Sequence, residues 1–259
     1  MKLKFNSNTI IGSIIGDIVG SIYEWRNTKD YNFDIFPSEG TFTDDSVLTV
    51  AIADSILHQK DFEKSLWTYG RKYSDRGYGG WFQSWLGQNN PQPYNSFGNG
   101  SGMRVSPVGF AYPDVPTVLQ KARETAEVTH NHPEGIKGAQ AVAAAVFLAK
   151  KTYSKEEIKN YIVKTFAYDL NFSIDEIRPE YTFDVTCQGS VPQAIVAFLE
   201  SANYEDAIRK AISLGGDSDT IACMTGGMAA AFHKHIPKEF LDYAEERLPE
   251  EFIEIINEF

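Results

Sequence analysis

Hydrophobic residues recur with a period of 3.6 along most of this chain, and this pattern constrains the fold more than any other feature. Such spacing predicts helices, whereas the alternating runs typical of strands are nearly absent. Ser154 and Glu157 form a capping box, Pro192 is expected at a helix start, and Pro237 and Pro249 punctuate the C-terminal helices. We therefore predict an all-α fold with helices over about 9–25, 44–59, 61–74, 117–128, 134–151, 154–167, 192–202, 204–213, 219–234 and 237–247.

The length and composition favour one globular domain. A chain of 259 residues with 42% hydrophobic and 13% aromatic residues can bury a substantial core. No repeat of fixed period, charge block or linker divides the sequence. We expect a single compact domain over 1–259, and a monomer.

The net charge limits the partners. With 24 Lys and Arg against 35 Asp and Glu, the charge of −11 argues against sequence-independent nucleic-acid binding, which needs a basic face. An acidic chain that binds a phosphate ligand needs backbone amides or metal ions to do so.

The cysteines and the N-terminus favour a reduced, soluble setting. Cys187 and Cys223 lack the spacing of a zinc site or a disulfide framework. The apolar run near the N-terminus is interrupted by Asp17, and no small-residue cleavage site follows it. We interpret this run as a core helix, and expect a cytoplasmic protein without membrane association.

Two predicted helices begin with clustered oxygen donors. Thr43, Asp44 and Asp45 precede one apolar helix, and "GGDSDT", which ends at Thr220, precedes another. Simple capping explains an aspartate at one helix start. Two such starts suggest more, because four converging carboxylates need cations, and oxygen-only donors suit Mg²⁺ or Mn²⁺. A bridging carboxylate could then hold two metals about 3.5–4 Å apart.

Two further features have both a structural and a functional interpretation. Gly12, Gly16, Gly20 and Glu24 are spaced by four, which suits close helix packing but could also fix Glu24 in place. The segment 75–115 is rich in glycine, asparagine and proline, and long irregular segments are usually functional. Its glycine-rich part is either a surface turn or a loop that points backbone N–H groups at phosphate, and it lacks the ending of a P-loop.

Five motifs in order resemble the signatures of the ADP-ribosylglycohydrolase family. They are "GSIIGDIVGSIYEW", "TFTDDS", "GNGSGMRVSPVG", "THNHPEG" and "GGDSDT", and together they span about 10–232. The resemblance implies an all-α orthogonal bundle around a binuclear Mg²⁺ or Mn²⁺ site. This chain departs from the family pattern at position 46, where the family often has threonine. Ser46 keeps the hydroxyl group.

The resemblance also implies roles for individual residues. Glu24 would gate the site and take part in acid/base chemistry, and His130, otherwise a cap or core histidine, would contact the ligand. The implied metal ligands are Thr43, Asp44, Asp45, Asp217, Asp219 and Thr220. The residues implied to wrap the diphosphate of ADP-ribose are Gly98, Asn99, Gly100, Ser101, Gly102 and Met103.

The activity implied by the resemblance is metal-dependent hydrolysis of an ADP-ribosylated protein or small molecule at the anomeric carbon of the distal ribose. Which group activates the water stays open, as does the acceptor; a nucleic-acid acceptor is one option, although no basic face is expected. Two alternatives are a noncatalytic ADP-ribose-binding or structural relative and a phosphoesterase. The complete acidic set speaks against the first, and the lack of an arginine cluster against the second.

Overall fold

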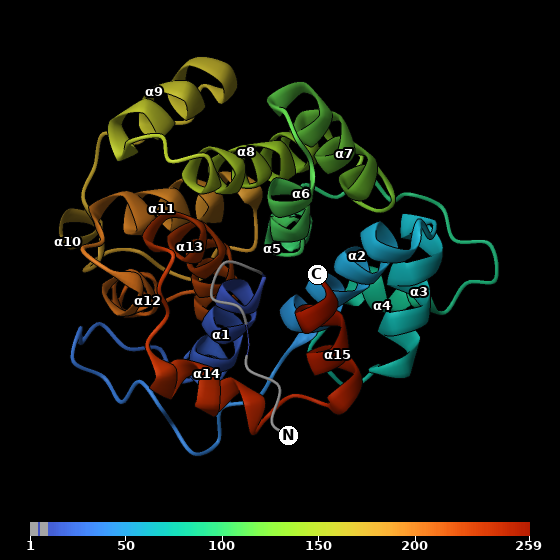
Figure 1. The fold of residues 1–259 in the computed structure, drawn as a ribbon, viewed down its shortest axis with the longest axis horizontal. Helices are drawn as coiled ribbons and strands as arrows, with labels where there is room; N and C mark the ends of the chain where they lie inside the picture. Colours follow the sequence, from blue (N-terminus) through green and yellow to red (C-terminus); the bar gives the residue numbers. More distant parts are fainter. Residues whose placement is uncertain (1–4, 6–9) are drawn as a thin grey trace.

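The centre of the molecule is a pair of helices from opposite ends of the sequence. The computed structural model describes residue 5 and residues 10–259. Helix α1 (Ile11–Gly20) is buried along its whole length and packs against α13 (Ser218–His233), which is buried except at its C-terminal end. Figure 1 shows α1 and α13 side by side, with α14 below them and α8 and α11 above. The first and last parts of the chain therefore share one core.

Glycines bring α1 and α13 into backbone contact. A Cβ built at Gly16 would lie 2.1 Å from the carbonyl oxygen of Ala222, and one at Gly226 would lie 2.2 Å from that of Gly12. A Cβ at Gly20 would lie 2.5 Å from the Cα of Asp219. The structural interpretation of the glycine ridge is confirmed, because no other residue permits so close an approach.

The remaining helices form layers on both sides of this pair. Helices α8, α11 and α12 pack against α13 on one side, and α2 lies on the other side with α3, α5 and α6 around it. In chain order they are α2 (Asp44–His58), α3 (Phe62–Lys72), α4 (Gly80–Leu86), α5 (Gly100–Met103), α6 (Ser106–Ala111), α7 (Val115–Glu127), α8 (Pro133–Lys150), α9 (Lys155–Phe166), α10 (Ile174–Ile177), α11 (Cys187–Glu200), α12 (Tyr204–Ser213), α14 (Lys238–Glu245) and α15 (Glu250–Glu258).

The predicted all-α class is confirmed. Among residues 5 and 10–259 the only β-type pairing is one isolated bridge between Gly98 and Thr186. The capping box at Ser154 is present, with Glu157 completing it at the start of α9. Pro237 and Pro249 directly precede α14 and α15, as their positions in the sequence indicated.

Several helix boundaries differ from the prediction. Pro192 lies inside α11 and not at a helix start, because Thr186 caps the helix earlier by accepting a hydrogen bond from the Gly189 amide. The first predicted helix ends at Gly20 and continues as turns through Glu24, and its first position, residue 9, lies outside the described residues. Short helices α4, α5 and α6 occupy parts of the segment predicted to be irregular.

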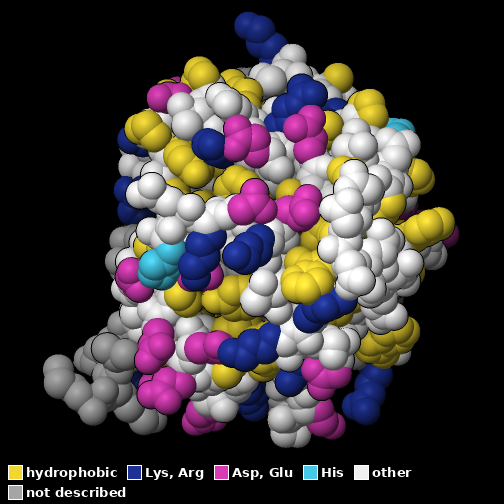
Figure 2. Space-filling view, turned by 90° about the vertical axis from the view of Figure 1, so that its right-hand side faces the viewer, with side chains coloured by type: hydrophobic (Ala, Val, Ile, Leu, Met, Phe, Trp, Pro, Cys, Tyr) yellow, Lys and Arg dark blue, Asp and Glu magenta, His cyan; other side chains and the backbone are white. Residues whose placement is uncertain are grey.

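The surface in Figure 2 carries no patch of one charge sign. On this face, basic and acidic side chains alternate with hydrophobic ones, so no basic stripe suited to a phosphate backbone is seen there. None of the described helices has the length and apolar character needed to span a bilayer.

Candidate metal and ligand site

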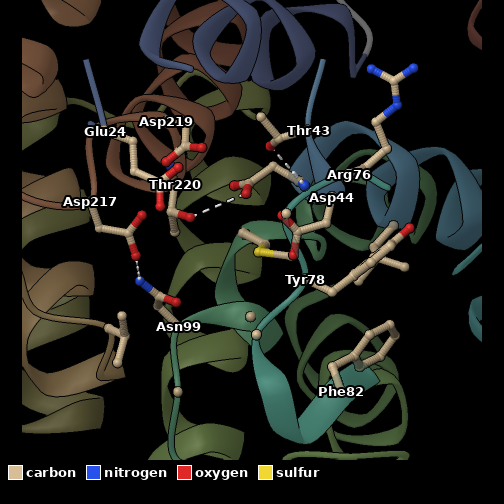
Figure 3. Close-up of a pocket in the computed structure, with 18 of the residues that line it drawn as sticks. Glu24, Thr43, Asp44, Arg76, Tyr78, Phe82, Asn99, Asp217, Asp219 and Thr220 are labelled. Atoms are coloured by element: carbon tan, nitrogen blue, oxygen red, sulfur yellow. Dashed lines mark hydrogen bonds between the residues drawn. The ribbon is translucent and has the colours of Figure 1, made fainter. Parts of the chain in front are cut away.

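A cavity of about 850 Å³ opens where the turn after α1, the N-termini of α2 and α13, and the glycine-rich loop meet. Figure 3 shows carboxylates from α2 and α13 on one wall of this cavity, with Tyr78 and Phe82 on another. The sequence-predicted residues on the wall are Glu24, Thr43, Asp44, Asp45, Gly98, Asn99, Gly100, Met103, His130, Asp217, Asp219 and Thr220. The two helix starts therefore converge, as the paired acidic motifs suggested.

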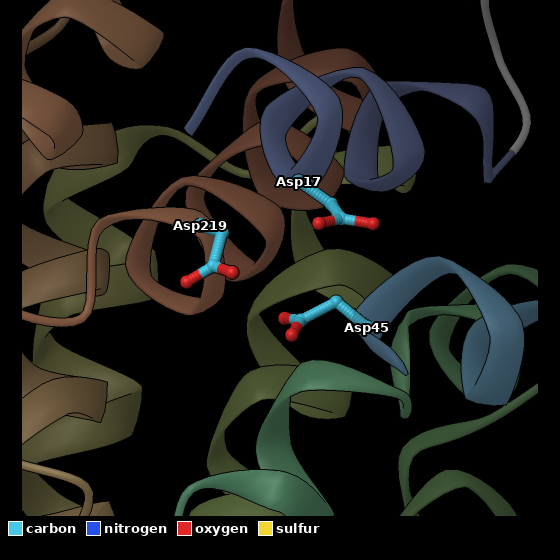
Figure 4. Close-up of side chains that lie close together, drawn as sticks. All are labelled: Asp17, Asp45 and Asp219. Carbon is cyan, nitrogen blue, oxygen red and sulfur yellow. The ribbon is translucent and has the colours of Figure 1, made fainter. Parts of the chain in front are cut away.

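Three carboxylates from three helices meet at the base of the cavity. Asp17 of α1, Asp45 of α2 and Asp219 of α13 each offer an oxygen, and these oxygens lie within 4.8 Å of one another. All three side chains are buried, and Figure 4 shows them pointing toward a common centre. Oxygen donors at this spacing suit a hard divalent cation.

Asp17 was not among the predicted site residues. Its carboxylate accepts hydrogen bonds from the Thr43 amide at 2.9 Å, the Thr43 hydroxyl at 2.6 Å, the Ser46 amide at 3.0 Å, and the Ser46 hydroxyl. Asp17 therefore caps the N-terminus of α2 from α1 and ties the two helices together. The available signal was a charged residue inside the otherwise apolar, glycine-spaced stretch "IIGDIVG".

A second group of carboxylates shares Asp219 with the first. Glu24, Asp217 and Asp219 also offer oxygens within 4.8 Å of one another. The Asn99 side chain donates a hydrogen bond of 2.6 Å to Asp217. Asp219 thus lies between the two groups, which is the position that a bridging ligand would occupy.

Simple capping does not account for the acidic residues of α13. Asp217 occupies the N-cap position but accepts no capping hydrogen bond through its side chain. At α2 the cap is Thr43, whose hydroxyl accepts from the Asp45 amide. Asp219 does accept one first-turn amide, that of Thr220, at 2.9 Å, so Asp217 is the aspartate of α13 that capping does not employ.

The two threonines of the site direct their hydroxyl hydrogens toward carboxylates. Thr43 donates to Asp17, and Thr220 donates to Asp45 over 3.2 Å. A hydroxyl that donates to a carboxylate keeps oxygen lone pairs for another partner. In the part of the chain that the structure describes, the second oxygen of Asp45 is buried without a hydrogen-bond partner. A bound cation would supply the partner that the buried Asp45 oxygen and the two threonine hydroxyl oxygens lack.

Burial and mutual repulsion raise the pKa values of the aspartates. The pKa values of Asp45 and Asp219 lie well above the ordinary value of 3.8, first because of burial and then because of neighbouring carboxylates. Burial also raises the pKa of Asp17, although hydrogen bonds from Ser46 and Thr43 oppose that rise. Ionising these buried carboxylates side by side is costly, and a bound cation would offset that cost by stabilising their charged forms.

Asp44 lies apart from both carboxylate groups. Its amide donates to the Arg76 carbonyl oxygen at 2.8 Å. Its carboxylate faces the side of the cavity near Tyr78 (Figure 3), and the charge of Asp44 contributes, after burial, to raising the pKa of the Tyr78 hydroxyl. Of the four predicted acidic ligands, Asp44 is the one that neither group contains.

Glu24 lies at the edge of the site on the turn after α1. Its amide still donates to the Gly20 carbonyl oxygen at 3.2 Å, so the glycine ridge positions it over α13. Partial burial, followed by repulsion from Asp217 and Asp17, raises the pKa of Glu24 to about 7. A carboxyl with this pKa can both accept and donate a proton near neutral pH.

The glycine-rich loop contributes only part of its predicted set to the cavity. Ser101 and Gly102 do not line it: the Ser101 hydroxyl donates to the Gly135 carbonyl oxygen at 2.8 Å, and Gly102 faces the Met224 sulfur. The amides of Gly98, Asn99, Gly102 and Met103 donate to acceptors within the protein. Within the described residues no such acceptor faces the amides of Gly100 and Ser101; of these two residues only Gly100 lines the cavity, so its N–H group is the one left for a ligand.

His130 lies directly beneath this loop. A Cβ built at Gly100 would lie 3.1 Å from Nε2 of His130, so only a glycine leaves the ring in place. Its Nδ1 lies 2.7 Å from the Thr129 hydroxyl. Burial, and secondly the charge of Arg104, lowers the pKa of His130 well below 6.5, so the imidazole is neutral at physiological pH.

Exposed aromatic residues surround the mouth of the cavity. Trp25 and Trp81 have 81% and 77% of their surface exposed, and Phe183 has 51%. The sequence assigned no role to any of them, although Trp25 ends the first motif, because a single aromatic residue carries no spacing signal. They make the entrance apolar, although its floor is acidic.

Comparisons with known proteins show the family to which the chain belongs. The family model described as ADP-ribosylglycohydrolase matches residues 7–258. The chain belongs to the ADP-ribosylglycohydrolase family. Membership makes it a glycohydrolase enzyme, as the five motifs indicated.

The relatives that the chain resembles are similar over most of their length. ADP-ribosylhydrolase ARH3 of Homo sapiens is 28% identical, with 86% of this chain and 84% of the relative covered. ADP-ribosylhydrolase ARH3 of Xenopus tropicalis is 26% identical, with 87% and 86% covered. A solved structure titled ADP-ribosylglycohydrolase-related protein complex has a TM-score of 0.74, with 22% identity, 99% of this chain and 98% of that chain covered. This last likeness supports the fold.

Proposed function

We propose that this enzyme removes ADP-ribose from a modified acceptor by hydrolysing the bond at the anomeric carbon of the distal ribose, with two Mg²⁺ or Mn²⁺ ions bound in the cavity. The observation that carries this proposal is the pair of carboxylate groups that share Asp219. The relatives named as ADP-ribosylhydrolases support the choice of ADP-ribose as the group removed.

The donor chemistry of the site fits divalent cations. Asp17 and Asp45 would serve one ion and Asp217 the other, with Asp219 shared, and Glu24 would lie beside the second ion without serving as its ligand. The unpartnered oxygen of Asp45 supports this assignment. The other proposed ligands are Thr43, Asp44 and Thr220. Bound divalent cations supply charge stabilisation for hydroxyl groups of the ribose and lower the pKa of a water molecule.

The remaining chemistry belongs to the protein side chains. Glu24, whose pKa is raised to about 7 in the metal-free protein, is the group we assign to accept or donate the proton at the scissile bond. The free amide of Gly100 would donate to a diphosphate oxygen, which gives an acidic chain an anion contact without lysine. The cavity of about 850 Å³ has room for a ligand of this size.

The test is release of ADP-ribose from a panel of acceptors modified on arginine, on serine and on nucleic-acid ends. Wild type with Mg²⁺ or Mn²⁺ should release free ADP-ribose from at least one acceptor, and a chelator or Asp219→Asn should abolish the release. Binding of ADP-ribose without turnover of any acceptor would contradict the proposal and favour a noncatalytic relative. Four points stay predictions: the identity of the acceptor, a single domain over 1–259, a monomeric state and a cytoplasmic location.

A further inference from the structure

A buried arginine lies behind the glycine-rich loop, outside every role assigned above. Arg104 follows α5, is fully buried, and donates from Nη2 to the Thr125 carbonyl oxygen at 2.9 Å and to the Thr129 hydroxyl at 2.8 Å. Burial lowers its pKa to about 10, so the guanidinium stays charged at neutral pH. Fully buried charges are rare unless they have a specific partner.

The hydrogen bonds of Thr129 link Arg104 to His130. A guanidinium has no acceptor, so the Thr129 oxygen must accept from Arg104. The same oxygen lies 2.7 Å from Nδ1 of His130. The Thr129 hydroxyl has one hydrogen to donate, and in this arrangement its acceptor is Nδ1 of His130.

Tyr94 is the other polar group near this hydroxyl. Its ring centroid lies 6.0 Å from that of His130; burial raises the pKa of its phenol, and the charge of Arg104 and a hydrogen bond with Thr129 oppose that rise. A phenol that donates to Thr129 leaves the threonine hydrogen directed at His130, because the hydroxyl oxygen can accept twice and donate once. The direction of the bond to His130 is then unchanged.

We propose that Arg104 and Thr129 are positioning residues that hold His130 as the neutral tautomer with its hydrogen on Nε2, so that this N–H is a fixed donor to the bound ligand. Nε2 lies beneath Gly98 and Gly100, where a Cβ would be 3.5 and 3.1 Å away. It is therefore next to Gly100, whose unpaired amide lies on the cavity wall. This inference rests on the proposed function only for the ligand, a phosphate oxygen of ADP-ribose.

The direct measurement is side-chain nitrogen NMR of the histidines, because a protonated and an unprotonated ring nitrogen resonate far apart. Wild type at neutral pH should show His130 with hydrogen on Nε2 and not on Nδ1. An Nδ1–H tautomer or a charged imidazolium in wild type would overturn the proposal, whether or not the protein binds ADP-ribose.

Variants at the two positioning residues test the direction of the hydrogen bonds. Thr129→Val removes the donor at nearly constant volume and should change the tautomer populations of His130, whereas Thr129→Ser keeps the hydroxyl and should match wild type. Arg104→Met should give a mixture of tautomers, because the threonine hydrogen is then free to turn. Unchanged tautomer signals in both Thr129→Val and Arg104→Met would contradict the inference.

Calorimetry with ADP-ribose connects the tautomer to the ligand. Thr129→Val should bind ADP-ribose on the order of tenfold more weakly, which is the contribution of one well-placed hydrogen bond, and Thr129→Ser should bind like wild type. Equal affinities in Thr129→Val and wild type would show that His130 makes no such bond. Failure of wild type to bind ADP-ribose would instead contradict the proposed function, with the NMR result standing by itself. A thermal melt separates loss of folding from loss of the tautomer.

Discussion

The contact between α1 and α13 gives a stability prediction that the structure makes quantitative. In Gly16→Ala the new Cβ would lie 2.1 Å from the Ala222 carbonyl oxygen, 2.5 Å from the Ala222 carbonyl carbon and 2.9 Å from the Cys223 amide nitrogen. Ordinary van der Waals contact begins at 3.4 Å. All three atoms belong to backbone, which cannot change rotamer, so the helices have to separate.

The expected loss follows from two opposing contributions. Overpacking costs up to about 3 kcal/mol, and replacing glycine by alanine inside a helix returns about 1 kcal/mol. The net loss of about 2 kcal/mol should lower the melting temperature by roughly 4–8 °C for a chain of this size. Differential scanning fluorimetry, checked by calorimetry, measures this shift.

A matched control is available at the exposed start of α4. A Cβ at Gly80 would meet nothing within 4 Å, so Gly80→Ala should keep or slightly raise the melting temperature. Because Gly16→Ala also moves Asp17 away from Asp219, it should reduce the stabilisation by added Mg²⁺ or Mn²⁺. Equal melting temperatures for the two variants would refute the claim that the backbones touch.

Further predictions concern the cavity. Mg²⁺ or Mn²⁺ should stabilise verified metal-free protein, by about 2.7 kcal/mol at a hundredfold excess over Kd, and Asp219→Asn should lose this gain; an unchanged wild-type melt would exclude the site. Glu24→Gln should lower turnover of an ADP-ribosylated substrate by about 10²- to 10⁴-fold while metal and ADP-ribose still bind, and an unchanged rate would assign the proton to an aspartate. Gly100→Val should weaken ADP-ribose binding in calorimetry but keep the metal gain, because its Cβ meets His130; equal affinity would make the loop a simple turn. Since the folded state keeps His130 neutral, the unfolded chain takes up the extra proton below pH about 6.5, and stability from this residue falls as pH falls. His130→Gln should therefore flatten the loss of melting temperature between pH about 7 and 5, and parallel curves would contradict this.

The sequence was sufficient for the fold class because helical periodicity extends through most of the chain. It was insufficient at helix starts, where local chemistry competes: Pro192 is a good first-turn residue, yet Thr186 supplies the cap that places it inside α11. The segment 75–115 contains three short helices that its glycine and proline content did not predict. Tertiary contacts stabilise these helices, and intrinsic helix propensity does not.

Knowledge of the site from sequence was similarly uneven. The helix starts with Asp45 and Asp219 could be identified because their oxygen donors are clustered along the chain. Asp17 and Arg104 could not, although both lie within quoted motifs, because each acts through partners that are distant in sequence. The sequence shows Asp17 only as a charged residue within an apolar helix, and that pattern does not indicate which residues it contacts.

The pairing of α1 with α13 has a consequence for synthesis on the ribosome. Asp17 is translated 202 residues before Asp219, so the proposed metal site is incomplete until α13 has been synthesised. Until then the isoleucines of α1, fully buried in the finished protein, lack their main packing partner. Exposed apolar helices of this kind are prone to aggregate. We expect the nascent chain to depend on chaperones until α13 leaves the exit tunnel, and the proposed metal ions to bind only after that.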